Sequence, residues 1–321
     1  MLSYLVRRLL WAMVLFVAVT AVTYIIFFTI PSDPARLACG QRASQNCVRA
    51  AAAFIGTDRP VYVQYARFLD RLVVHHSLGR SFVNRRPVND EVLAAAPVTA
   101  SLVFGGMVLW LLIALPVGVL SAVRPRSLLD RLAMVGVLVG ISAHPVWIGL
   151  LAAYFFGFKL HLFPISGYCD LINPSGTCGG PVQWTYHLFL PWATLAVLYA
   201  AIYVRMIRAN VIEAMNEEYV RTARAKGASE WRVLRAHVLR TALLPTVTML
   251  GMDVGLALSG AIFIETVYGL NGLGKLALQG VNTIDLPTTQ GVVVFATTTI
   301  LLFTLVVDCV YAWIDPRIRL T

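Results

Sequence analysis

The sequence has few charged residues. Only 13% of its 321 residues are Asp, Glu, Lys or Arg, and 58% are hydrophobic, whereas soluble globular chains carry about 25% charged residues. A chain of this composition would expose too much apolar surface in water. The composition therefore excludes an ordinary soluble domain and indicates a protein embedded in a bilayer.

Six stretches of the chain are nearly free of charge. A helix needs about 20 mostly apolar residues to cross a hydrocarbon core roughly 30 Å thick. Runs of this kind lie at Leu9 to Ile30, Val98 to Val123, Leu132 to Phe158, Leu188 to Val204, Leu244 to Ile264 and Thr288 to Ala312. They lack the alternation of barrel strands, and open sheet edges cannot be satisfied in lipid. The predicted fold class is an all-α integral membrane protein with six transmembrane helices.

The first apolar run follows Arg7 and Arg8, as the core of a cleaved signal sequence would. We expect it to be retained, because its apolar stretch exceeds a signal core and Pro31, Asp33 and Arg36 precede any small-residue cleavage site. The predicted organisation is residues 1–97, with this helix and an extracytoplasmic cap, followed by residues 98–321, with five further helices.

Basic residues are scarce in the short loops that we place outside the cell membrane, which hold only Lys159 and Lys275. Basic residues in short loops stay in the cytoplasm. The inner segments hold Arg7 and Arg8, then Arg124, Arg126 and Arg131, then the set from Arg205 to Arg240, and finally Arg317 and Arg319. Both termini are therefore predicted to be cytoplasmic. The long segment from Pro31 to Pro97 is expected outside despite its arginines, because long translocated loops escape the rule.

The formal net charge of +10 follows mostly from this topology. It does not indicate a basic groove for nucleic acid, which is not an expected partner.

Cysteines are few, and four of the five fall in the predicted outer loops. Disulfides persist on the oxidising side of a membrane, and four cysteines allow three pairings. We favour the local pairs Cys39 with Cys47 and Cys169 with Cys178. The alternative is that all five are reduced. A metal site is not expected, because C-x-x-C spacing is absent and the histidines lack metal-ligand spacing.

The outer segment contains one amphipathic stretch, RPVYVQYARFLDRLVV. A helix here places apolar side chains on one face and charges on the other, which suits a helix lying on the membrane surface or against the bundle. The apolar face comprises Tyr65, Phe68, Leu69, Leu72 and Val73, and the opposite face Arg67, Asp70 and Arg71. Such a helix would be either a docking element or a packed cap.

The loop between the fourth and fifth runs, about residues 208–243, is not linker-like. Its pattern predicts one helix from Glu213 to Lys226, a turn at Gly227, and a second helix that Ser229 caps and that continues toward Pro245.

The stretch EYVRTARAKGASEWRVLRAHVLRTALLP, from Glu218 to Pro245, resembles the cytoplasmic EAA loop of ABC importer permeases, especially their dipeptide and oligopeptide branch. Further stretches agree in order: DRPVYVQYARFL, LGRSF, RRPV, ETVYGLNGLGKL and VVDCVYAWIDPRIR. Together they extend over most of the chain. The general motif has Glu where Arg221 stands and Leu-Pro where Leu239 and Arg240 stand; the peptide branch resembles this chain in keeping a later proline, here Pro245.

The resemblance implies the type I ABC permease fold in a bacterial inner membrane, with contacts to lipid. It implies three kinds of protein partner: a homologous second permease subunit, two cytoplasmic ABC ATPases, and an extracytoplasmic binding protein. No cofactor is expected in this chain, since ATP and Mg would lie on the ATPases. The residues expected to couple to an ATPase are Glu218, Tyr219, Arg221, Thr222, Ala223, Ala225, Lys226, Gly227, Ser229 and Trp231. The small side chains would permit close approach, and Arg221, Arg224 and Lys226 would supply charge complementarity.

Asp253 interrupts the fifth run. An ionisable group at membrane depth costs about 2.5–3.5 kcal/mol on insertion scales and should face the bundle interior. We interpret it as a candidate for the translocation path, where it would attract a peptide ammonium; a structural hydrogen bond to a neighbouring helix is the alternative.

Other functions fit less well. The sequence GLNGLGK, from Gly269 to Lys275, matches part of a phosphate loop, but Leu276 replaces the magnesium-binding Ser or Thr. Enzyme chemistry in this chain is therefore not expected. A stand-alone ion-coupled carrier would want inverted repeats or buried charge pairs, which the sequence does not show. Peptides are the expected substrates, with nickel chelates or glutathione as the alternative.

Overall fold

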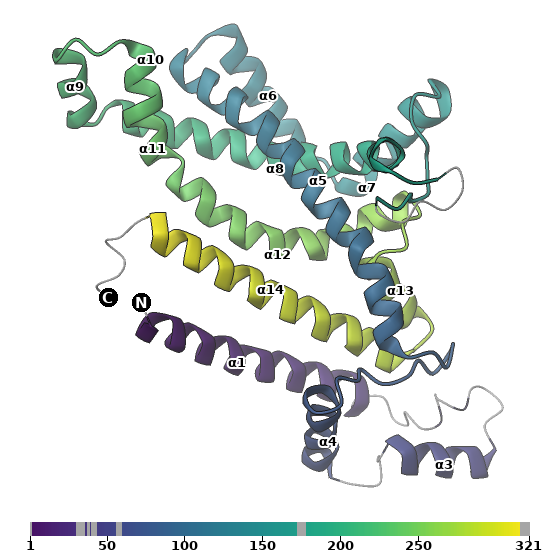
Figure 1. The fold of residues 1–321 in the computed structure, drawn as a ribbon. Coiled ribbons are helices and arrows are strands. Elements are labelled where there is room, and N and C mark those ends of the chain that lie inside the picture. Colours follow the sequence, from purple (N-terminus) through teal and green to yellow (C-terminus); the bar gives the residue numbers. More distant parts are fainter. Residues whose placement is uncertain are drawn as a thin grey trace. The chain divides into compact units, whose positions relative to one another are not determined.

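The computed structural model describes residues 2–29, 36, 39, 44–55, 60–171 and 178–314, and these are almost entirely helical (Figure 1). The chain forms two compact units, one of residues 1–99 with 271–321 and one of residues 100–270. Helix α5 (Val88–Val123) contributes to both units.

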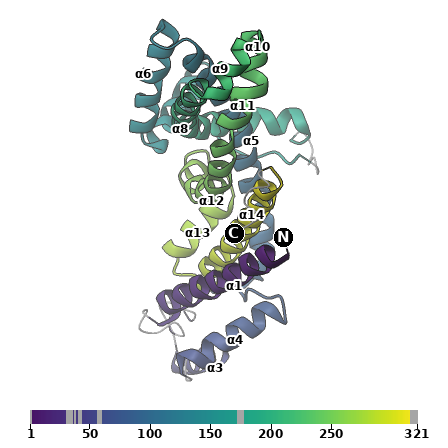
Figure 2. The same cartoon turned by 90° about the vertical axis from the view of Figure 1, so that its left-hand side faces the viewer.

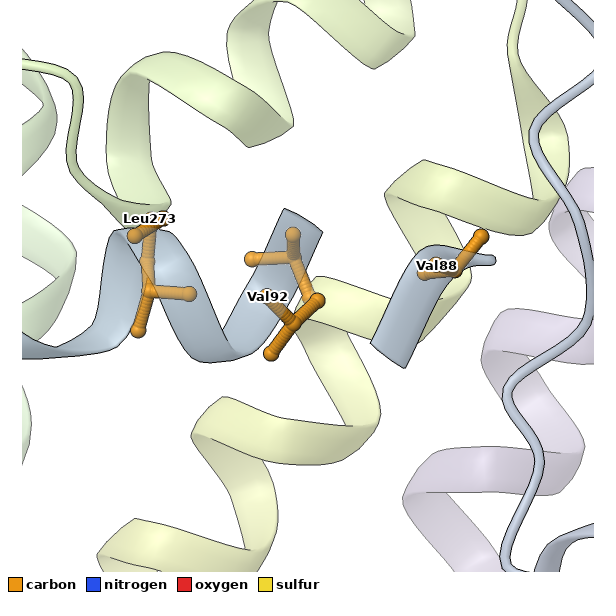
Figure 3. Packing of buried hydrophobic residues seen from close by; sticks show 5 residues of the cluster. Val88, Val92 and Leu273 are labelled. Carbon is orange, nitrogen blue, oxygen red and sulfur yellow. The ribbon is translucent and has the colours of Figure 1, made fainter. Parts of the chain in front are cut away.

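The first unit contains two terminal helices that lie side by side and run in opposite directions (Figures 1 and 2). These are α1 and α14, and the unit's elements are α1 (Leu2–Tyr24), η1 (Ile25–Thr29), α3 (Gln45–Ile55), α4 (Val61–Val73), the start of α5, α13 (Leu273–Asn282) and α14 (Leu286–Ile314). One part of its core joins Val88, Val92 and Ala95 of α5 to Leu273 and Val292 (Figure 3).

Helix α4 is the predicted amphipathic helix, and it packs against α1 and α14. Phe68 is buried with Tyr24 and Val294, and Tyr65, Leu69 and Leu72 pack around them. The Tyr65 hydroxyl also donates to the Val17 carbonyl at 3.0 Å. Val73 was wrongly assigned to this face: it is 63% exposed at the end of the helix. The predicted face is otherwise the packed one.

A carboxylate joins two distant loops of the first unit. Asp285, at the start of α14, accepts hydrogen bonds from the Ser81 hydroxyl, the Phe82 N–H at 2.9 Å and the Thr288 hydroxyl at 2.9 Å. Because a buried carboxylate is costly unless it is hydrogen-bonded, this set of donors holds the segment before α5 against α14.

The second unit is a bundle in which α8 contacts most of the other helices. Its elements are the rest of α5, α6 (Leu128–Ser142), α7 (Pro145–Ala152), η2 (Ala153–Lys159), α8 (Pro181–Met215), α9 (Glu218–Ala225), α10 (Glu230–Arg232), η3 (Val233–Val238), α11 (Leu239–Ala242) and α12 (Leu244–Val267). Small residues bring α5 close to α8: a Cβ on Gly105 would lie 2.0 Å from the Trp192 ring, and one on Gly118 would lie 2.9 Å from Ile207. Close backbone approach through glycine is typical of membrane helix pairs.

The third predicted span is not one straight helix. Helices α6 and α7–η2 meet at an angle of 107°. Pro145 cannot donate a backbone hydrogen bond and disfavours helical geometry at the preceding residue. His144 is accordingly extended, and its Nδ1 accepts from the Val146 N–H at 3.3 Å, which caps α7.

Helices occupy all six predicted apolar runs. Within the described residues, four helices are long and apolar enough to cross a membrane, or five if the bent pair forms one span. Helix α12, with 24 residues, covers the fifth run. The all-helical membrane fold is confirmed, whereas the number of crossings and the cytoplasmic placement of both termini stay predictions. Residues 315–321, with the end of the C-terminal motif, lie outside the described residues.

Candidate coupling site

A short helical hairpin follows α8 and forms the candidate site (Figure 1). Helix α9 ends at Ala225, and Gly227 takes a left-handed φ of 80°, which favours glycine. The N–H of Ala228 returns to the Ala223 carbonyl at 3.2 Å. We call residues 218–242 the coupling hairpin.

The start of the first hairpin helix was predicted wrongly. A single helix from Glu213 to Lys226 was expected, but α8 continues to Met215 and α9 begins at Glu218. The break lies at Asn216, whose side-chain amide donates to the Ile212 carbonyl at 2.9 Å. Asn commonly bonds backbone groups in this way at helix ends. Ser229 occupies the predicted capping position before α10, with extended backbone but no side-chain cap hydrogen bond.

The inner side of the hairpin is apolar. Val220, Val233 and Val238 are buried. A pocket of about 210 Å³ lies between the hairpin and the ends of α5 and α8, and it is lined by Val123, Met215, Arg224, Glu230, Trp231, Val233, Leu234 and Val238. The hairpin therefore faces the ends of α5 and α8 across this pocket, and its η3 and α11 segments contact α8.

The outer side of the hairpin carries the predicted coupling residues. Trp231, which also borders the pocket, is 68% exposed, and Tyr219 is 41% exposed. The structure also exposes Glu218, Arg221, Thr222, Ala225, Lys226, Gly227 and Ser229, whereas Ala223 is half-buried. Large apolar side chains exposed in this way mark interaction surfaces.

Arg224 differs from its expected role in charge complementarity with a partner. Its guanidinium donates from Nε to Glu230 Oε1 at 2.9 Å and from Nη2 to Glu230 Oε2 at 3.2 Å. This two-bond pair crosses the Gly227 turn and joins α9 to α10. The charge of Arg224 is thus paired with a carboxylate of the same chain.

One cluster near the hairpin was missed by the sequence reasoning. Asp130, at the start of α6, is 4% exposed and accepts from Arg208 Nε at 2.7 Å and Nη2 at 3.0 Å. The Ser121 hydroxyl and the Arg126 N–H, the latter at 2.8 Å, also donate to it. Arg126 takes a left-handed φ of 63°, a conformation that costs roughly 1–2 kcal/mol. Only the local part was visible in the sequence, as the helix-start spacing of Ser127 and Asp130.

Asp253 lies inside the second unit, in the middle of α12. It is 8% exposed and lies near Tyr203 of α8, whose buried hydroxyl forms no hydrogen bond of ordinary geometry with any residue that the structure describes. Tyr199 lies one turn earlier on α8 and stacks on Trp110 of α5 with ring centroids 4.6 Å apart. Three helices therefore meet around one buried acid, as expected for an ionisable group at membrane depth.

The four candidate cysteines are joined as the two favoured local pairs, Cys39 with Cys47 and Cys169 with Cys178. The Cys169 Sγ lies 3.4 Å from His187 Nδ1 of α8. The second disulfide therefore holds the loop before α8 close to that helix.

The phosphate-loop-like sequence follows a helix, whereas a phosphate loop follows a strand. Gly269 takes φ +65° in a turn after helix α12, not after a strand. Across the described part of the chain, no group of three or more His, Cys, Asp or Glu side chains is placed to hold a metal ion.

Long apolar helices, a bundle closed by glycine contacts and an exposed helical hairpin define a multi-pass membrane transport protein rather than a soluble domain. The chain belongs to the family described as "Binding-protein-dependent transport system inner membrane component", whose profile matches residues 114–320. The profile of that family's N-terminal part matches residues 1–103. The chain is therefore the inner membrane permease component of an ABC importer, as its motifs predicted.

Relatives align with nearly the whole chain. The "Probable D,D-dipeptide transport system permease protein DdpB" of Escherichia coli (strain K12) is 38% identical over 98% of this chain and 97% of its own length. The "Dipeptide transport system permease protein DppB" of the same strain is 34% identical over 99% of each chain. A crystal structure of an amino acid ABC transporter with histidines shares the fold at a TM-score of 0.50 and 16% identity, covering 71% of this chain and 94% of that one.

Proposed function

We propose that this permease passes di- and oligopeptides into the cell and that the coupling hairpin receives the motion of an ATPase subunit. The observation that carries the proposal is the hairpin itself, which is stiffened inside and exposes Tyr219, Trp231 and small residues outside. The peptide substrate is supported by the names of the two Escherichia coli relatives, which are dipeptide transport permeases.

The hairpin has features suited to passing the motion of a partner to the membrane helices. Its outer side offers aromatic anchors and, at Ala225 and Gly227, room for close approach by a partner. Its inner side borders a pocket with Val123 of α5 and Met215 of α8, and its η3 and α11 segments contact α8. A displacement of the hairpin by a partner would therefore be passed to α8.

The transport cycle in this proposal is alternating access. The chain pairs with a second permease subunit, two ATPases bind on the cytoplasmic side where the hairpin and both termini lie, and an extracytoplasmic protein delivers the peptide. ATP binding and hydrolysis then shift the pair of permeases between two states that differ in their contacts. ATP hydrolysis takes place on the partners, and Asp253 is the candidate in this chain for attracting a peptide ammonium along the path.

Reconstitution tests the proposal. The permease pair, its ATPases and the binding protein are placed in sealed liposomes with ATP on the ATPase side, and uptake of a labelled dipeptide is measured beside a nickel chelate and glutathione. We expect dipeptide accumulation that requires both ATP and the binding protein. Uptake that continues without ATPases would indicate an ion-coupled carrier, and binding without accumulation would indicate a receptor.

A further inference from the structure

The Asp130 cluster joins three long helices at one carboxylate. Ser121 belongs to α5, Asp130 to α6 and Arg208 to α8, and Asp130 accepts hydrogen bonds from both of the other side chains. Arg208 bridges both carboxylate oxygens, and the bidentate arrangement fixes orientation as well as distance. The three helix ends are thus held in one relative position.

This cluster lies close to the ends of α5 and α8, which border the pocket beneath the coupling hairpin. Arg208 precedes Met215, the last residue of α8, by about two helical turns. Ser121 precedes Val123, the last residue of α5, by two positions. Met215 and Val123 both line the pocket beneath the hairpin. Asp130 therefore ties to α6 the two helices whose ends border that pocket.

Part of the contact between α6 and α8 consists of small residues. Gly140 of α6 faces Ala201 and the Val197 carbonyl of α8, where an added Cβ would lie 2.8 Å and 3.1 Å from them. Small residues permit close packing but present no large side chain to resist sliding of one helix along the other.

Helix α6 leads on to the bent segment. After the 107° bend, the Gly149 carbonyl of α7 accepts a hydrogen bond from the Tyr268 hydroxyl, next to the end of α12, at 3.2 Å. The Tyr268 hydroxyl also lies 2.9 Å from Thr194 Oγ1 of α8. A movement of α6 can therefore be passed to α7 through the chain, and from α7 to α8 and α12 through these hydrogen bonds.

We propose that Asp130 and Arg208 are positioning residues for energy coupling: they make the ends of α5, α6 and α8 move as one block with the coupling hairpin, so that displacement of the hairpin reaches α6 and α7. This inference rests on the proposed function of the hairpin. A merely structural pair would influence how much complex folds, but not how much substrate moves for each ATP hydrolysed by the folded complex.

The experiment uses the full transport complex in liposomes and measures labelled dipeptide accumulated per ATP hydrolysed, normalised to folded complex. The variants are Asp130→Asn and Arg208→Gln, and the matched control is Arg205→Gln, because Arg205 is an exposed arginine one turn earlier on α8. We expect both variants to bind the ATPases and hydrolyse ATP, while dipeptide moved per ATP falls about two- to thirtyfold, the range found for residues that carry coupling. The control should match the wild type.

If the first two variants do not fold, Arg208→Lys tests the inference in their place. Lysine keeps the charge but cannot bridge both carboxylate oxygens in a fixed geometry, so we expect a smaller drop in the same ratio. An unchanged ratio in the folded variants, or equal losses in the Arg205→Gln control, would overturn the inference. If the wild-type complex itself showed no ATP-driven uptake, the proposed function would fail instead.

Discussion

Glu230 accepts two hydrogen bonds from the guanidinium of Arg224, at 2.9 Å from Nε and 3.2 Å from Nη2. The pair spans the Gly227 turn, so it sets the spacing of α9 and α10 on the side of the hairpin that faces the pocket. An arginine and a glutamate six positions apart thereby hold together the two hairpin helices whose exposed side we assign to the ATPase.

Substitution Glu230→Gln should have a modest effect. Glu230 is largely exposed, and exposed ion pairs contribute about 0.2–1 kcal/mol, which corresponds to a change of up to about fivefold in ATPase affinity. Titration of the reconstituted permease with ATPase measures this affinity, with Glu213→Gln on the exposed end of α8 as the control. A hundredfold loss would instead show that Glu230 contacts the ATPase directly.

Gly227 permits a separation of backbone strain from side-chain bulk. Its φ is 80°, and a Cβ would meet no atom of the chain within 4 Å. Gly227→Val should destabilise the hairpin by roughly 1–2 kcal/mol, because valine disfavours left-handed backbone. Gly227→Asn should leave the hairpin close to its wild-type stability, because asparagine tolerates this conformation. Both variants should reduce ATPase capture if a partner surface approaches this position closely. Normal ATP-driven coupling in both variants would refute the assigned contact.

The contact between α5 and α8 should be sensitive to one added methyl group. A Cβ on Gly105 would lie 2.0 Å from the Trp192 ring, so Gly105→Ala should lower stability by about 1–3 kcal/mol through overpacking. Gly136→Ala on α6 is the matched control, because its Cβ would meet nothing within 4 Å and alanine favours helix over glycine by about 1 kcal/mol. Thermal unfolding in detergent should therefore move in opposite directions for the two variants, and equal shifts would contradict the packing.

Asp253 can be tested as a substrate contact by comparison with its neighbour. If its carboxylate attracts a peptide ammonium, Asp253→Asn should lower dipeptide uptake about tenfold or more, as expected for a hydrogen bond to a charged group. Tyr203→Phe retains the carboxylate and should have a smaller effect. With an N-acetylated dipeptide, which lacks the ammonium, the two variants should show the same uptake. Identical losses for both variants and both peptides would favour a purely structural role.

The cysteines predict a simple labelling pattern. Four of the five cysteines are paired in disulfides, so alkylation of the denatured, unreduced chain should modify Cys309 alone. Reduction should make all five react. The mass of the labelled chain gives the number of labels in each case. Four additional labels before reduction would show that these cysteines are not paired in disulfides.

Local patterns accounted for much of the fold and for the hairpin. The apolar face of α4 follows from the spacing of Tyr65, Phe68, Leu69 and Leu72, and the turn at Gly227 follows from the preference of glycine for left-handed backbone. Helix ends were less predictable. Val73 lies at the end of α4, and Asn216 interrupts a pattern that otherwise continues as helix, because its side chain competes for a backbone carbonyl.

The sequence by itself determined that the chain is a helical membrane protein and a member of an importer permease family, because hydrophobic length and short motifs are properties of consecutive residues. Only the tertiary structure decided that Asp130 binds Arg208 and that Asp253 lies near Tyr203. The physical reason is that Asp130 and Arg208 are 78 positions apart, and such partners meet only when separate helices pack. Local composition does not specify which helix faces meet.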